Sequence, residues 1–412
     1  MIYLFIFIYL LYLSIHYDIL ENRDYKWTNY KIAIALLILV AGLRWRVGSD
    51  TVIYAQEFVQ SHDLFHLRWD DLASLGRMPL WVLLNAICKS IWNDFLLVQF
   101  IVAAFSISVT GYFIKKVCPS LCFFILLCYY IGGRYSSLHL ELLRESMAVS
   151  FYLLGLLAIN KEKYKLALLY SFLAMMFHIF AFASVLIFVV VNYLIPRNRL
   201  VRFSICVVAL SLTLLNDDFV ISFVENYMEF LSVNEEIELT ILGYASSEDY
   251  GNIDKSIVNY SWLIIQFFDY IIMMYKCKNI YTNFILFRRE LFNSGMLICI
   301  VLLCLKYSFL ILYRIGLNYN YFFTCVVAVM FTKGILIEKI KKSQRAFVYF
   351  MLILFPLFFC CKFYFSKDYV YEFNYWYSRY YPYSSVLDKT FDYNREKLHN
   401  NRGVGYSEIN DY

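Results

Sequence analysis

Two arginines, a glycine, an aspartate and a tyrosine follow an apolar segment at a spacing that suits phosphate binding. They are Arg44, Arg46, Gly48, Asp50 and Tyr54, directly after the apolar residues 32–43. Guanidinium groups present paired donors that match phosphate oxygens. A charge near the bilayer centre costs at least about 2.5 kcal/mol on insertion scales, so charges gather at helix ends or in cavities. The alternative is that these arginines anchor the helix end at the membrane interface, which does not explain the Gly-Ser-Asp that follows.

Three further polar side chains stand at the ends of apolar segments. Arg144 begins one such segment, and it either pairs with Glu141 across a helical turn or faces a cavity as a ligand for an anionic head group. His178 lies between two apolar stretches, either as a base and hydrogen-bond donor or as a structural hydrogen-bonding group. Arg314 lies between two later apolar segments. Arg144 and Arg314 are candidates for the same anion-binding site as Arg44 and Arg46.

The composition predicts an all-α polytopic membrane protein. Hydrophobic residues make up 61% of the 412 residues, and apolar runs near the ~20 residues that a spanning helix needs recur along the chain. A backbone in lipid must satisfy its own hydrogen bonds, so these runs predict helices. About twelve spanning helices are expected, near residues 2–16, 30–45, 95–114, 119–134, 141–159, 165–178, 180–195, 200–215, 258–275, 291–311, 316–333 and 345–365. The short segment Pro79–Ile91 is left open as a span or as a re-entrant or interfacial helix.

The basic residues sort into two sets of loops. By the positive-inside rule the richer set is cytoplasmic, which places both termini outside. This set comprises Arg23, Lys26, Lys115, Lys116, Lys161, Lys163, Lys165, Arg197, Arg199, Arg202, Lys276, Lys278, Arg288, Arg289, Lys333, Lys339, Lys341, Lys342 and Arg345. The opposite face is predicted to hold Arg44, Arg46, Arg144 and Arg314 at helix mouths. A lipid-linked pyrophosphate fits that pattern, because its charge lies at head-group depth and its tail lies in lipid.

An acidic loop at about 216–257 is predicted on the same outer face. A long loop of this kind is either a lid or binding loop or a solvated connection.

Several classes of site are disfavoured by the sequence. It contains no acidic pair typical of nucleotide-sugar sites, no P-loop and no dinucleotide-binding fingerprint, so ATP and soluble activated sugars are poor candidate substrates. The eleven cysteines show no C-x2-C spacing, which supports neither a zinc site nor a disulfide framework. The apolar segment Met1–Ile15 lacks a basic start and a cleavage site, so it is predicted to be the first spanning helix. No metal or cofactor is expected.

At these residues the chain resembles the EpsG family of Wzy-like bacterial polysaccharide polymerases. The resemblance rests on four elements in order: Leu43–Tyr54 with Phe58; Arg77–Asn85 with Lys89; Leu143–Ala148 followed by Lys163-Tyr164 and Ala174–His178; and Tyr313–Gly316 with Tyr321-Phe322 and Tyr381–Val386. One departure is Met78, where the family commonly has an acidic residue before the proline. Asp50 and Asp70 are the candidates to replace that carboxylate.

The resemblance implies a metal-independent glycosyltransferase with a GT-C-like helical bundle in the bacterial cytoplasmic membrane. It would join undecaprenyl-diphosphate-linked repeat units of O-antigen or exopolysaccharide on the outer face. It implies one polymerase domain over 1–365, an extracytoplasmic tail over 366–412, and a chain-length regulator as the protein partner to look for. Nucleic acid is not an expected partner.

The predicted site follows from the resemblance and the arginine pattern together. Arg44, Arg144, Asp50 and His178 are the expected catalytic residues, and Arg46, Arg314, Tyr54 and Gly48 are expected to bind substrate. The arginines would offset charge on the departing diphosphate. The competing interpretations are a flippase or transporter for lipid-linked oligosaccharide, an O-antigen ligase and a membrane O-acetyltransferase.

Overall fold

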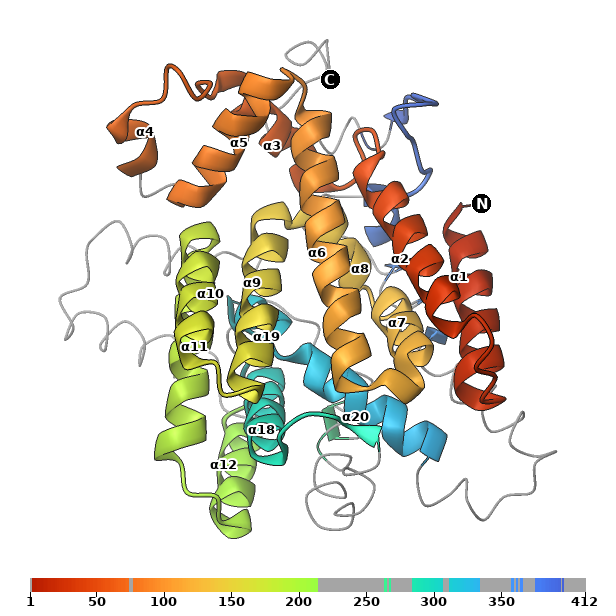
Figure 1. The fold of residues 1–412 in the computed structure, drawn as a ribbon, viewed down its shortest axis with the longest axis vertical. Coiled ribbons are helices and arrows are strands. Elements are labelled where there is room, and N and C mark those ends of the chain that lie inside the picture. The colour runs from red at the N-terminus through yellow and green to blue at the C-terminus, as the bar shows by residue number, and fades with distance from the viewer. Residues whose placement is uncertain are drawn as a thin grey trace. The chain divides into compact units, whose positions relative to one another are not determined.

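In the computed structural model in Figure 1, the regular secondary structure of the described residues is helical. It describes residues 2–73, 77–213, 263–264, 267, 284–306, 311–333, 357–358, 361, 364–365, 375–393 and 395. Over these residues the only pairing outside helices consists of isolated antiparallel bridges. The predicted acidic loop at 216–257 and most of the predicted helices 258–275 and 345–365 lie outside the described residues. The chain divides into two units.

Unit 1 comprises residues 1–182, 284–286 and 328–412. Its helices are α1 (Ile2–Leu13), α2 (Lys26–Gly42), α3 (Ser49–Gln60), α4 (Trp69–Ala73), α5 (Pro79–Ile91), α6 (Phe95–Val117), α7 (Cys122–Ile131), α8 (Arg134–Ser136), α9 (Leu143–Asn160), α10 (Tyr164–Phe177) and the start of α11 (Ile179–Val189). Short π-helical turns at Ser14–Ile19 and Ser137–Glu141 and 3₁₀ turns at Pro119–Leu121 and Trp376–Arg379 complete it. In the core of this unit, α9 packs against α10 and α6, and α2 packs against α6.

Helix α6 connects two ends of unit 1, one beside Arg44 and the other beside Trp27. Lys115, near the end of α6, lies 4.1 Å from the ring centroid of Trp27 at the start of α2. Gln99, near the start of α6, donates to the carbonyl of Arg44 at 2.8 Å, just beyond the end of α2. At about 1.5 Å per residue, the stretch of α6 from Gln99 to Lys115 separates these two contacts by roughly 24 Å. Lys26 and Lys115 therefore lie at one end of unit 1, and the predicted site residue Arg44 lies at the other.

Unit 2 comprises residues 183–283 and 287–327. Its described helices are the remainder of α11 with the π-helical turn Val190–Leu194, α12 (Arg199–Leu212), α18 (Arg289–Leu305), α19 (Ile311–Leu317) and most of α20 (Asn320–Lys333). Helix α12 packs along α18, and α18 packs against α19. The α18 glycine Gly295 lets the Phe322 ring approach, since a Cβ at this position would lie 2.6 Å from it. A close helix contact of this kind is typical of helices packed inside membrane proteins.

Helix positions agree well with the predictions, whereas the predicted number of membrane spans is tested only over the residues that the structure describes. Two described helical runs, Ile2–Ile19 and Phe95–Val117, have the length and composition to cross a membrane, and a third candidate is the pair Pro119–Ile131 and Arg134–Glu141, bent by 72°. The predicted total of about twelve spans is therefore not confirmed. The physical reason is that breaks in the chain, such as the one between α10 and α11 at His178, leave apolar helices such as Tyr164–Phe177 shorter than a full span.

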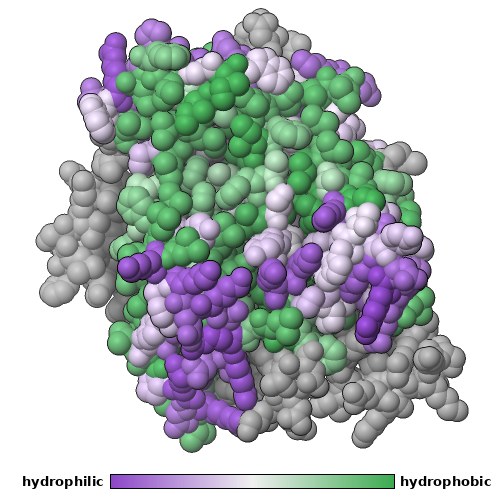
Figure 2. Space-filling model, viewed as in Figure 1, coloured by the Kyte–Doolittle hydropathy of each residue, from purple (hydrophilic) through white to green (hydrophobic). Residues whose placement is uncertain are grey.

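The surface fits a membrane protein. Figure 2 shows hydrophobic side chains covering much of the visible face of the described helices. On α10, for example, Leu168 is 72% exposed and Phe172 is 50% exposed. Large contiguous apolar surface of this kind marks an interaction with membrane or partner, and lipid is the solvent that suits apolar helices. Helix α5 has 13 residues, fewer than a straight span requires.

Candidate functional site

The first predicted site element forms a tightly bonded loop, residues 44–48, which we call the arginine loop. Arg44 is fully buried. Its guanidinium donates to the Val47 carbonyl at 3.1 Å, to the Thr51 hydroxyl at 3.2 Å and to the Ala41 carbonyl. These acceptors belong to the end of α2, the loop itself and the first turn of α3. Arg44 therefore ties three consecutive pieces of backbone together, and its guanidinium would have to leave them to bind a diphosphate.

Arg46 and Gly48, the two loop residues predicted to bind substrate, are also buried. Arg46 is 1% exposed, has a positive φ of 52° and lies over the Trp45 ring, 5.8 Å from its centroid. Gly48 has φ +93°, and a Cβ there would lie 1.8 Å from the Leu140 carbonyl oxygen. Only glycine fits this position, because a side chain would be both strained and blocked. The glycine thus allows the loop to approach the segment before α9.

Within unit 1, backbone hydrogen bonds join the C-terminal segment 375–393 to the arginine loop and to the residue before it. The Trp45 amide donates to the Ser384 carbonyl at 2.9 Å, and the Val386 amide donates to the Leu43 carbonyl at 2.9 Å. The described part of the predicted tail 366–412 is therefore packed against the loop, and the domain boundary at 365 stays a prediction. The late Tyr381–Val386 motif was the one sequence signal that pointed to this segment.

Glu141 holds the start of α3 to that same C-terminal segment. Its Oε1 accepts from the Ser49 hydroxyl at 3.0 Å and lies 3.3 Å from Arg379 Nη1, and both side chains of the ion pair are nearly buried. A carboxylate at a helix N-terminus also interacts favourably with the helix dipole. The alternative pairing of Glu141 with Arg144, expected from their spacing, is not formed, because the carboxylate turns to Ser49 and Arg379 instead.

A second group of side chains, the Arg144 cluster, lies on the neighbouring faces of α3, α9 and α10. It consists of Asp50, Tyr54, Arg144, Glu145 and His178. Arg144 donates a hydrogen bond to the Tyr54 hydroxyl, and its guanidinium carbon lies 5.7 Å from the Tyr54 ring centroid. Burial raises the pKa of the Tyr54 phenol, so the phenol keeps its proton at neutral pH. Arg144 opposes that shift, while Asp50 and Glu145 add to it.

Arg144 differs from Arg44 in how its donors are used. Its side chain is partly exposed, and its buried Nε atom has no hydrogen-bond acceptor among the described residues. A buried donor without a partner costs about 1–3 kcal/mol. An anion that accepted from Arg144 would remove this cost, which makes the Arg144 cluster the better-placed anion site of unit 1.

Glu145 and His178 form the other half of the cluster, and sequence reasoning missed Glu145. His178 Nε2 lies 3.4 Å from Glu145 Oε1, and the two residues are 8% and 5% exposed. The pair joins the first turn of α9 to the break that follows α10. The only sequence signal was an acidic residue directly after Arg144 at the start of an apolar helix.

The second motif element supports α3 from its other end. Lys89 on α5 donates to the carbonyls of Phe58, Val59 and Ser61, at 2.7–3.0 Å, where α3 ends. A cation at a helix C-terminus satisfies its last carbonyls and complements the dipole. Elsewhere on this element, Arg77 Nε donates to Glu57 at 2.9 Å.

Asp50 and Asp70, the two candidates to replace the acidic residue missing at Met78, lie in different environments. Met78 is the residue before α5 and has an extended backbone. Asp70, on α4, is exposed, whereas Asp50 acts electrostatically on Tyr54 in the Arg144 cluster. Glu145 is a third carboxylate to consider.

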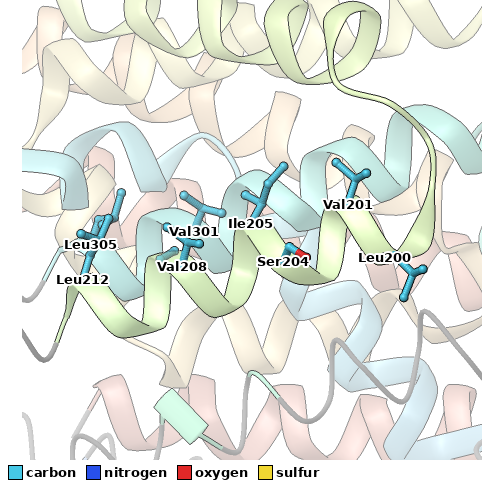
Figure 3. Close-up of a pocket in the computed structure, with 9 residues that line it drawn as sticks. Leu200, Val201, Ser204, Ile205, Val208, Leu212, Val301 and Leu305 are labelled. Carbon is cyan, nitrogen blue, oxygen red and sulfur yellow. The ribbon is translucent and has the colours of Figure 1, made fainter.

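Unit 2 offers a groove of a different kind. In Figure 3 aliphatic side chains of α12 and α18 line it, with Leu200, Ile205 and Val208 on α12 and Val301 and Leu305 on α18. Ser204 is its one polar lining residue. The groove therefore suits hydrocarbon and cannot hold a diphosphate. Arg314 lies in α19 of this unit, and its role as a ligand stays a prediction.

The arrangement in unit 1 brings together a guanidinium, a protonated phenol and a carboxylate held by an imidazole. Over the residues described, no group of three or more His, Cys, Asp and Glu side chains could hold a metal ion. A family model, that of the EpsG family, matches residues 27–385. No curated protein and no solved structure matches the chain.

Proposed function

The chain belongs to the EpsG family of Wzy-like polysaccharide polymerase-type proteins, and from this premise we propose that it polymerises a lipid-linked bacterial surface polysaccharide. The donor is a growing glycan on undecaprenyl diphosphate, and the acceptor is a sugar hydroxyl of the next lipid-linked repeat unit. The acceptor oxygen forms a bond to the anomeric carbon, and undecaprenyl diphosphate leaves with the electron pair of the broken bond. The donor is already activated, so the reaction needs no nucleotide.

The observation that carries this proposal is the buried Nε of Arg144, which has no acceptor among the residues that the structure describes, in a side chain that contacts Tyr54. A guanidinium with an available donor stabilises charge as it develops on a leaving diphosphate. Asp50 and His178 are the further candidates for work on the acceptor hydroxyl, as predicted from the sequence. The ligand roles of Arg44 and Arg46 stay predictions, with the loop geometry favouring Arg144 over both.

The proposed setting is the outer face of the cytoplasmic membrane, in a polytopic bundle. The basic end of unit 1, with Lys26 and Lys115, would lie in the cytoplasm, and the Arg144 cluster would lie at the opposite face. Lipid-linked diphosphates present their charge at head-group depth, where the end of a helix bundle can reach it. The apolar flank of the bundle would accommodate the isoprenoid tail.

The experiment that tests this function is a gel of surface glycan from cells that lack the gene. We expect the polymer ladder to disappear while a single repeat unit on the lipid anchor remains. Loss of that single unit as well would indicate flipping or an earlier step, and full-length glycan that stays on its lipid would indicate a ligase. An unchanged ladder would contradict the proposal for that glycan.

A further inference from the structure

Helix α5 carries large apolar side chains on its exposed face as well as on its buried face. Trp81, Asn85 and Cys88, spaced by four and three residues, mark the buried face, and each is at most 5% exposed. On the other side Ile87 is 38% exposed and Ile91 is 71% exposed, and their spacing of four residues puts them on one face. A helix that turns its outer side to water is polar on that side. The outer face of α5 therefore fits an apolar environment.

The loop that follows α3 adds to this exposed apolar surface. The Leu64 amide donates to the Ser90 hydroxyl at 2.9 Å, which bonds the loop to the last turn of α5. Leu64 is 45% exposed, and the next residue, Phe65, is 83% exposed. Trp92, directly after α5, is 51% exposed. We call these exposed side chains the apolar rim, which consists of Leu64, Phe65, Ile87, Ile91 and Trp92.

The connection to α6 places the apolar rim near the membrane surface. Helix α6 has the length and composition to cross a membrane. Its 23 residues make it about 34 Å long, close to the thickness of the hydrocarbon layer, so its first residue, Phe95, lies near the membrane surface. Three residues, 92–94, separate α5 from α6, so Ile91 lies within about 14 Å of Phe95. In Figure 1, α5 lies beside the upper end of α6, against which it packs.

We propose that the apolar rim inserts into the border between acyl chains and head groups, in the membrane leaflet where α6 begins. Helix α5 has 13 residues and is about 20 Å long, too short to cross the membrane, so it lies in the interface. Trp92 suits this depth, because its indole joins a large apolar ring to one hydrogen-bond donor. The polar residues Asn93 and Asp94 follow it, and Asp94 accepts from the Leu96 amide at 2.8 Å. Lipid is the occupant of the rim because the rim leads directly into a helix that has the length to span the membrane.

An interfacial α5 would also set the depth of the Arg144 cluster, and this part of the inference rests on the proposed polymerisation. Trp81, on the buried face of α5, packs edge-on against Tyr54, with ring centroids 5.3 Å apart. Tyr54 in turn lies 5.7 Å from the guanidinium carbon of Arg144. Lys89 of α5 holds the end of α3 through three backbone carbonyls. An α5 anchored in the interface keeps the cluster at head-group depth, where a lipid-linked diphosphate presents its charge.

The test is the fluorescence of Trp92 in the full-length protein, in nanodiscs of phosphatidylethanolamine and phosphatidylglycerol. Trp92→Phe removes this one emitter, so the difference between wild-type and variant emission isolates Trp92. Bromine-labelled acyl chains report contact with hydrocarbon, and iodide in the buffer reports contact with water. We expect the brominated chains to quench the Trp92 emission at least about threefold more than iodide does, since an interfacial side chain is buried in the acyl border.

Trp81 is the matched control for the quenching, because it lies on the opposite face of the same helix and is 2% exposed. The emission isolated with Trp81→Phe should respond weakly to both quenchers.

The consequence for the site is tested with the double substitution Ile87→Ser and Ile91→Ser. Both side chains point outward, so the core is left intact. We expect KM for the lipid-linked repeat unit to rise about 3–10-fold with kcat within about twofold of the wild type, because a poorly anchored α5 no longer fixes the depth of Arg144. An unchanged KM would contradict the part of the inference that concerns depth.

Two quenching results would overturn the insertion itself. Strong quenching of Trp92 by iodide with none by brominated chains would place the apolar rim in water. Quenching by neither would show that protein covers the rim, such as a second copy of this chain. Both results leave polymerisation intact, which is contradicted instead if the wild-type protein fails to extend the lipid-linked repeat unit.

Discussion

The arginine loop and the Arg144 cluster use the same side chain in opposite ways. Arg44 is fully buried, and its guanidinium donates hydrogen bonds to two backbone carbonyls and one hydroxyl. Arg144 remains partly exposed, donates to one phenol and keeps a buried Nε without an acceptor over the described part of the chain. Both arginines stand next to an apolar helix in the sequence. The comparison teaches that an arginine at a helix mouth is a ligand candidate only when the surrounding backbone leaves its donors unused.

The two regions nevertheless depend on each other through α3. The arginine loop fixes where α3 begins, and Glu141 and Arg379 hold its first turn to the C-terminal segment. One turn later α3 presents Tyr54 to Arg144. The loop therefore acts on the cluster by position. Substitutions in the loop and in the cluster can separate a positional effect from a chemical one.

Gly48→Ala should give the largest loss. The added methyl would stand 1.8 Å from the Leu140 carbonyl oxygen at φ +93°, so the loop must move, and we expect a cost above about 4 kcal/mol. Thermal unfolding in detergent and the polymer ladder measure the two consequences. Gly133→Ala is the matched control, since Gly133 has φ +74° but its nearest neighbour, the Tyr364 hydroxyl, is 3.8 Å away. It should cost only about 1–2 kcal/mol, and equal losses in the two variants would contradict the steric argument.

Arg379→Met should come next. It leaves the Glu141 carboxylate buried without its cation, and breaking a buried ion pair costs about 3–5 kcal/mol. Adding Glu141→Gln should recover part of this loss, because the amide carries no charge and can still accept from Ser49. Denaturation of the single and double variants measures the coupling. Strictly additive losses would show that the C-terminal segment does not act through this pair.

The paired substitutions Arg44→Lys and Arg144→Lys test the comparison most directly. A lysine at 44 keeps the charge but cannot reach three acceptors, so we expect a loss of about 1.5–3 kcal/mol in stability with kcat per folded molecule unchanged. A lysine at 144 should change stability by less than about 1 kcal/mol and lower kcat/KM about 10–100-fold. Unfolding midpoints and turnover of the lipid-linked substrate measure both. The reverse pattern would make Arg44 the diphosphate ligand.

Sequence reasoning reached most of the helices but only part of the site. Apolar runs predicted α1, α2, α6, α9 and α10 to within a few residues. The reason is that the hydrophobicity of consecutive residues is enough to indicate a buried or lipid-facing helix. Helix α3 falls outside the predicted helices, since its residues are amphipathic rather than apolar throughout. The cluster residues Tyr54, Arg144 and His178 were all predicted, whereas Glu145 was not. In the sequence Glu145 is an ordinary acidic residue in the first turn of a helix. Only the structure shows that His178 lies beside it.

The sequence by itself determined an apolar helical chain with a basic end and a set of arginines away from it, and it carried the family motifs in order. Only the tertiary structure shows that the Arg44 guanidinium donates to its own backbone, whereas Arg144 Nε has no acceptor among the described residues. That difference depends on contacts between distant residues, such as Arg379 with Ser49 across 330 positions and Ser49 with Glu141 across 92. Hydropathy and charge act residue by residue and can be read along a chain. The satisfaction of a buried donor depends on which acceptors the fold brings within about 3 Å, and no local pattern records that.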